Sequence, residues 1–119
     1  MPALELTTNV KVSDPKAFSL EFSKVAAEVL GKPELYISVA YNYSEFLTFN
    51  GSFDPAFLLK ITSLNNIEPK VNEVYSKALF AFFEKQLGIP GDRGYITFYD
   101  PGLAYLGHKG TTFAAIFGS

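Results

Sequence analysis

The sequence predicts an α/β fold in which two similar βαβ units build a four-stranded mixed sheet with two helices on one face. Short β-like runs alternate with amphipathic helices, and the same order of elements occurs twice, over about residues 2–50 and 56–105. Right-handed crossovers place both helices on the same face. The chain has 119 residues, of which 48% are hydrophobic and 18% charged, so we expect one globular domain over residues 1–119.

The first half is expected to contain a strand, a helix and a second strand. Residues 3–10 predict the first strand because apolar and polar side chains alternate there. Asp14 and Pro15 predict a helix start, since Asp caps helices and Pro is tolerated at the first helical position. Gly31 ends this helix, and the aromatic and β-branched residues 36–43 predict the next strand. The apolar stripe expected on the helix consists of Phe18, Phe22, Val25 and Val29.

The second half repeats this order. Residues 57–64 predict a strand, Pro69 opens a helix, Gly88 closes it, and residues 95–99 predict the last strand. The letters agree as well, because Leu-Gly-Lys-Pro at 30–33 corresponds to Leu-Gly-Ile-Pro in the second half. Duplication explains the shared order, and chance similarity is the alternative for so short a match. The second helix carries one apolar stripe of Val71, Val74, Ala78 and Phe82, and a second strip of Leu79, Phe80, Phe83 and Leu87.

The distribution of apolar residues predicts an oligomer. The strands look apolar on both sides, the second helix has an extra strip, and aromatic residues make up 16% of the chain. Exposing that surface would favour association, and a closed homo-oligomer covers it most simply. The alternative is that irregular segments near Asn50-Gly51 and over residues 107–110 fold across the open sheet face.

Composition excludes several classes of function. A net charge of -2 predicts neither a nucleic-acid partner nor a polybasic membrane-binding surface. The absence of cysteine and the single histidine, His108, exclude thiol chemistry, disulfides and a multi-histidine metal site, so no metal or cofactor is expected. The sequence contains neither a signal-peptide pattern nor a bilayer-spanning apolar run, so a cytoplasmic location is expected.

Pro2 and Lys32 are the candidate chemical groups. Removal of Met1 would leave Pro2 as a secondary amine at the start of a strand, with an unperturbed pKa of about 8. Burial or a nearby lysine lowers that pKa and produces a general base near neutrality. Lys32 occurs in one half only, since Ile89 is its counterpart, and converging strand ends could bring it beside Pro2. The plainer interpretation of Lys32 is a cation that stabilises the helix C-terminus.

Short motifs along nearly the whole chain carry a family resemblance. They are Met1-Pro2, Thr8-Asn9-Val10, Gly31-Lys32-Pro33, Tyr36-Ile37, Phe49-Asn50-Gly51-Ser52, Asp92-Arg93-Gly94-Tyr95-Ile96, Phe98-Tyr99-Asp100 and Thr112-Phe113-Ala114. At these residues the sequence resembles the macrophage migration inhibitory factor and D-dopachrome tautomerase family of the tautomerase superfamily. The resemblance implies a homotrimer whose sheets surround a central channel, with active sites between subunits.

The resemblance also implies roles for individual residues. Pro2, after loss of Met1, would be the catalytic base, and Lys32 and the Leu64 backbone would bind the acid group of the substrate. Tyr95 matches a tyrosine that the adjoining subunit contributes. The positions that match the pocket lining are Tyr36, Leu106 and Phe113.

The sequence departs from the family pattern at three places. Thr97 stands where well-studied members have Asn, at a position expected to contact substrate, and His108 replaces a tryptophan at the pocket rim. Residues 56–59 lack the Cys-Xaa-Xaa-Cys of some members, so a thiol oxidoreductase activity has no residues here. We expect His108, in a glycine-flanked loop, to be a surface residue.

The resemblance implies a cofactor-independent keto–enol tautomerase for small aromatic α-keto acids such as phenylpyruvate, with D-dopachrome as a neighbouring substrate. The alternative is a leaderless secreted, cytokine-like protein that binds a receptor, with the pocket subsidiary. A purely structural trimeric module would follow if Met1 were retained, because the Pro2 nitrogen would then be an amide without basicity.

Overall fold

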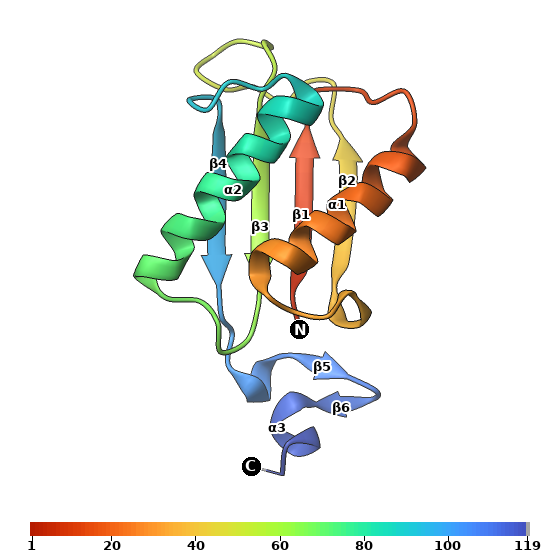
Figure 1. Ribbon diagram of the computed structural model, residues 1–119, viewed down its shortest axis with the longest axis vertical. Coiled ribbons are helices and arrows are strands. Elements are labelled where there is room, and N and C mark those ends of the chain that lie inside the picture. Colours follow the sequence, from red (N-terminus) through yellow and green to blue (C-terminus); the bar gives the residue numbers. More distant parts are fainter. Residues whose placement is uncertain (119) are drawn as a thin grey trace.

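The computed structural model describes residues 1–118, and its centre is a four-stranded sheet with two long helices on one face (Figure 1). The strand order is β2-β1-β3-β4. β1 is parallel to β2, β3 is parallel to β4, and β1 and β3 are antiparallel at the centre. This confirms the predicted mixed sheet. The elements are β1 (Ala3–Thr8), α1 (Pro15–Leu30), β2 (Ser38–Tyr43), β3 (Phe57–Thr62), α2 (Pro69–Leu87) and β4 (Gly94–Tyr99).

Both helices begin and end where the sequence predicts. The Asp14 side chain accepts a hydrogen bond from the Ala17 N–H at 3.0 Å and caps α1. At the other end, Gly31 adopts a left-handed conformation with φ 64°, which glycine tolerates without strain. Helix α2 ends in the same way, at Gly88 with φ 69°. The repeated glycine therefore has the same backbone task in both halves.

The buried face of α2 differs from the predicted stripe. The buried residues include Leu79, Phe83 and Leu87 from the strip expected to be surplus, whereas Val74 is 63% exposed. The Phe83 ring lies 4.7 Å from the ring of Phe57 on β3, measured between centroids, so this strip faces the sheet. Phe and Leu side chains bury more apolar area than Val and Ala, and burial of a larger apolar area is more favourable. Helix α2 therefore turns its Phe and Leu strip toward the sheet. The strip is therefore core, and it does not support an oligomer.

Helix α1 shows a smaller shift of the same kind. Phe18 and Phe22 are buried as predicted, but Ala26 and Leu30 complete the buried face. Val25 and Val29, which were expected there, are only partly buried against the core.

The open face of the sheet is mixed in character, so the prediction of strands apolar on both sides holds only in part. Leu58, Tyr95 and Tyr99 are exposed on this face, but polar side chains lie among them. Glu5 and Thr7 of β1 alternate with the buried side chains of the same strand. Together with Asn42 and Lys60 they line a shallow hollow of about 340 Å³ on this face. The Lys60 ammonium also lies 5.6 Å from the centre of the Tyr99 ring. Period-2 alternation separates a polar and an apolar face in strands whose overall composition is apolar.

The link between the two halves, residues 44–56, is held by two polar side chains. The Asn9 amide donates to the Asp54 carbonyl at 2.9 Å, and its oxygen accepts from the Ala56 N–H at 2.9 Å. The Arg93 guanidinium donates to the carbonyls of Asp54 and Pro55, both at 2.9 Å. One of these side chains comes from each half, so the link is fastened to both.

Several short elements were not predicted. The 3₁₀ turns Glu34–Tyr36 (η1) and Leu103–Tyr105 (η2), the two-residue strands β5 (Gly107–His108) and β6 (Thr111–Thr112), and helix α3 (Phe113–Ile116) are too short to show periodicity. β5, β6 and α3 extend below the sheet at the end where the N-terminus lies (Figure 1). Residues 107–110 therefore lie at the end of the sheet and do not cover its open face.

Replacement of Leu79 by alanine should lower the free energy of unfolding by about 2–5 kcal/mol, because it opens a cavity beneath α2. Val74→Ala, on the exposed side of the same helix, should change it by less than about 0.5 kcal/mol. Urea unfolding of both variants at one protein concentration measures the difference. Equal losses would contradict the orientation of α2.

Candidate active site

The start of β1 is buried at one end of the sheet. Pro2 is less than 2% exposed, and its carbonyl accepts a hydrogen bond from the Ser38 N–H at 3.1 Å. This bond extends the pairing between β1 and β2 by one residue beyond Ala3. The first residues of the chain are thereby held in place, although chain ends usually fray.

Lys32 and Tyr36 reach this end through the turn that follows α1. The Lys32 N–H donates to the Ala27 carbonyl at 3.1 Å, which fixes the residue directly after the left-handed Gly31. The η1 turn then carries Tyr36 back beside the chain start. Met1, Lys32, Tyr36 and Leu64 line a cavity of about 260 Å³, which we call the inner cavity and which Pro33, Asn65 and Phe117 complete.

A larger cavity of about 650 Å³, the outer cavity, adjoins it and shares Met1 and Tyr36. Phe113 forms part of its wall and is 3% exposed. The Phe113 N–H donates to the Leu106 carbonyl at 3.1 Å, so the C-terminal segment is closed onto itself. The other residues of the outer cavity are Pro2, Ala3, Leu35, Ile37, Ser38, Leu106, Gly107, His108 and Lys109.

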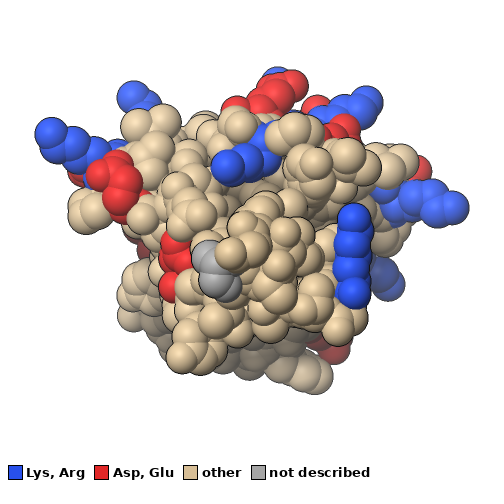
Figure 2. All heavy atoms as spheres, turned by 90° about the horizontal axis from the view of Figure 1, so that it is seen from below, with Lys and Arg blue, Asp and Glu red and all other residues tan. Residues whose placement is uncertain are grey.

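The electrostatics of this end favour a neutral amine beside a cation. Burial, followed by the positive charge of Lys32, holds the pKa of the amino group of Met1 below its usual value. Among the residues described, no Asp or Glu lines either cavity. Figure 2 looks onto this end of the molecule, where uncharged side chains cover the middle and both basic and acidic side chains lie around it.

The structure brings together six of the eight residues that the sequence indicated as a site. Pro2, Leu106 and Phe113 line the outer cavity, Lys32 and Leu64 line the inner one, and Tyr36 lines both. Within one chain, these groups provide a buried amine position, a cation and an apolar wall. That combination can hold an organic acid and move a proton to or from it.

Tyr95 and Thr97 lie elsewhere. Both are on the open face of β4, where Tyr95 is 66% exposed and pairs with Leu58 on β3. Leu58 in turn pairs with Thr7, five residues along β1 from Pro2, which is roughly 17 Å at 3.3–3.4 Å per residue. One chain therefore does not bring Tyr95 to its own cavities.

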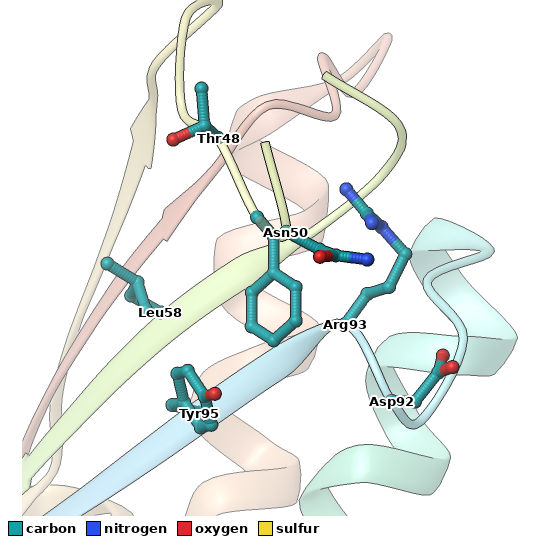
Figure 3. A pocket seen from close by; sticks show the side chains of 7 residues that line it. Thr48, Asn50, Leu58, Asp92, Arg93 and Tyr95 are labelled. Atoms are coloured by element: carbon teal, nitrogen blue, oxygen red, sulfur yellow. The ribbon is translucent and has the colours of Figure 1, made fainter. Parts of the chain in front are cut away.

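Tyr95 borders a separate pocket of about 440 Å³ at the far end of the sheet. Figure 3 shows Leu58, Asn50 and Arg93 around it. The ring of Phe49 lies 5.0 Å from that of Tyr95, and the Arg93 guanidinium lies 5.4 Å over Phe49. These contacts hold the link between the halves against the exposed tyrosine.

Some residues that line the cavities were not predicted from the sequence. Asn65, at φ 63°, and Phe117 line the inner cavity, and Lys109 lines the outer one. They belong to turns and the short C-terminal elements, for which spacing gives no signal. His108 is exposed as expected, but its ring also stacks on Phe113 with a centroid distance of 5.3 Å.

Within residues 1–118, no group of three or more His, Asp or Glu side chains is placed to hold a metal ion. None of the helices in the same range is long and apolar enough to cross a bilayer.

Lys32→Ala should raise the pKa of the N-terminal amine, because it removes one of the two causes that disfavour the charged form. Burial remains, so the pKa should stay below that of an exposed amine. The pH dependence of acylation of the amine, followed by mass spectrometry, measures it. Lys24→Ala, an exposed lysine within α1, is the matched control. An unchanged pKa in Lys32→Ala would contradict the assigned electrostatics.

Comparisons with known proteins agree with this architecture. The sequence profile of the macrophage migration inhibitory factor (MIF) family matches residues 1–114. A MIF homolog of Trichinella spiralis is 39% identical over 114 residues, which cover 95% of this chain and 100% of the relative. The MIF of Rattus norvegicus is 37% identical over 115 residues, which cover 96% and 100% of the two chains.

Solved structures extend the comparison to the fold. The structure of MIF from Trichinella spiralis superposes with a TM-score of 0.86 at 37% identity, covering 93% of this chain and 99% of that one. A MIF homologue from Prochlorococcus marinus gives a TM-score of 0.86 at 30% identity, covering 93% and 98%. These findings confirm the resemblance carried by the sequence motifs, and the chain belongs to the macrophage migration inhibitory factor family.

Proposed function

We propose that this protein is a cofactor-independent keto–enol tautomerase for small aromatic α-keto acids such as phenylpyruvate, with Pro2 as general base after removal of Met1. Membership of the MIF family, within the tautomerase superfamily, supports this class of reaction. The single observation that carries the proposal is the placement of the N-terminal amine, now on Met1, in the inner cavity with Lys32, where burial and the lysine lower the pKa of the amine.

The proposed reaction is a proton transfer with no net oxidation. Removal of Met1 would place the amine on Pro2, which is more deeply buried than Met1, so desolvation should also lower its pKa. The neutral nitrogen removes a proton from the carbon next to the ketone, and the electron pair moves toward the carbonyl oxygen. The prolinium then returns a proton to the other end of the enol system. A base with a pKa near the working pH suits both steps.

Lys32 and the apolar wall would orient the substrate. The Lys32 ammonium would pair with the substrate carboxylate in the inner cavity. The backbone at Leu64 lies in the same cavity. The substrate ring would then lie toward Tyr36 and Phe113, where aromatic surface is available. D-dopachrome, an aromatic acid of related shape, is a second candidate substrate for the same site.

We further propose that the active unit is a homotrimer in which a neighbouring copy supplies Tyr95 and Thr97. Two features support this assignment: Tyr95 is exposed, and it lies at the opposite end of the sheet from Pro2. A residue so placed can reach a substrate only in another copy of the chain.

Blocking the Pro2 amine should lower kcat/KM for phenylpyruvate by roughly 10²–10⁴-fold, because a positioned general base contributes about that factor. Mass spectrometry must first show that Met1 is absent. The Pro2→Gly variant, which keeps a primary amine but loses the rigid ring, should retain more activity than the blocked protein. If turnover survives in a verified and fully blocked protein, the amine is not the base.

Tyr95→Phe should raise KM for phenylpyruvate, because the hydroxyl proposed to contact the substrate is lost. The assembly should stay intact, because the exposed ring itself is kept. Enzyme kinetics and light scattering on the same sample measure the two effects. Monomeric wild-type protein at micromolar concentration would exclude the shared site. A loss of kcat as large as that of the blocked Pro2 protein would assign Tyr95 to proton transfer instead.

A further inference from the structure

The mouth of the outer cavity carries positive charge that the proposed reaction does not use. His108 and Lys109 line this cavity from the β5–β6 hairpin, while Lys32 lies in the adjoining inner cavity. Among the described lining residues of both cavities there is no carboxylate to neutralise them. An anionic group entering the outer cavity therefore meets two basic side chains and no opposing charge.

The hairpin positions the His108 ring and the backbone of Lys109. The His108 ring is stacked on Phe113 at a centroid distance of 5.3 Å and an interplanar angle of 8°. Phe113 is buried, and its N–H donates a hydrogen bond to the Leu106 carbonyl, so the histidine stacks on a ring that is itself held in place. Lys109 occupies the turn in a left-handed conformation with φ 54°, directly after the pairing of His108 with Thr111. Both basic residues are exposed, at the rim rather than the floor of the cavity.

Lys32 and the pair His108 and Lys109 would lie near opposite ends of a bound substrate. A keto acid held by Lys32 at its carboxylate would place its ring toward Phe113, in the outer cavity. A substituent at the far end of the ring would then face His108 and Lys109. We infer that these two residues form a second anion subsite, and that the preferred substrates are aryl α-keto acids with a second acidic group on the ring. This inference rests on the proposed function, because it uses the substrate orientation proposed there.

The other charged groups that face His108 are Lys109 on its own hairpin and, across the cavities, the N-terminal amine and Lys32. All of them are basic, so a second acidic group on the substrate ring meets no like charge there. A ratio of kcat/KM for two substrates cancels the contribution of the amine, because both reactions use the same base. A change in this ratio therefore reports the subsite.

The test compares (4-carboxyphenyl)pyruvate with (4-methylphenyl)pyruvate, which differ in charge at the far end of the ring. Lys109→Gln should lower the ratio of kcat/KM, acid over methyl compound, by about two- to fivefold, the usual range for an exposed charge pair. His108→Phe keeps a ring on Phe113 and should also lower the ratio, because the imidazole N–H donors are lost. Lys24→Gln, an exposed lysine within α1, should leave the ratio unchanged. A ratio equal to that of the wild type in both hairpin variants would overturn the subsite.

A binding measurement separates failure of the subsite from failure of the proposed reaction. Isothermal titration with 3-(4-carboxyphenyl)propanoate and 3-(4-methylphenyl)propanoate compares the same ring substituents without turnover. If neither keto acid turns over but Lys109→Gln still weakens binding of the dicarboxylate selectively, the tautomerase proposal fails and the subsite stands. If turnover occurs and Lys109→Gln affects both compounds equally, the subsite fails and the tautomerase proposal stands.

Discussion

The hydrogen bond between the Ser38 N–H and the Pro2 carbonyl is the contact on which the candidate site depends. It continues the β1–β2 pairing to the second residue of the chain, in a strand that β3 pairs from the other side. Chain ends usually fray, but here the carbonyl of the second residue is hydrogen-bonded to β2. Fixation of this kind is what the proposed role of Pro2 as a base requires, because a base acts efficiently only when its position relative to the substrate is fixed.

The two halves use one backbone design for different purposes. Gly31 and Gly88 both end their helices in a left-handed conformation, with φ 64° and 69°. The residue that follows differs: Lys32 lines the inner cavity, whereas Ile89 is 1% exposed and belongs to the core. The same turn therefore presents a cation to the site in one half and completes the packing in the other. This asymmetry places a lysine beside the candidate site in one half and an apolar core residue at the matching position of the other.

The sequence predicted those features that depend on local chemistry or on period. Caps such as Asp14 and the terminating glycines follow local rules, and the structure has them at the expected places. The alternating strands are also present, although β1, β2 and β3 are each two residues shorter than predicted. The orientation of α2 was predicted wrongly because the helix carries two apolar strips, and only packing against Phe57 selects between them. The cavity residues His108 and Lys109 lie in a hairpin with two-residue strands, and no periodicity exists at that length.

The position of Tyr95 illustrates a different limit. Its distance from Pro2 follows from how β4 pairs with β3 and β3 with β1. This pairing depends on the order of all the strands, which the pattern within one strand does not give. Local rules predict that Tyr95 lies on a strand. They do not predict whether it lies at the end of the sheet that holds the cavities or at the opposite end.

The fastening of residues 44–56 has a consequence for how the molecule can be divided. A link between duplicated units is ordinarily the place to open a chain, either for circular permutation or to express one unit alone. Here Asn9 from the first unit and Arg93 from the second both bond its carbonyl groups, and β1 and β3 pair across the boundary. A cut in this segment would leave backbone groups without partners in both units. The boundary suggested by the repeat is therefore not a boundary between independent structural units, and we expect the two units to fold and unfold together.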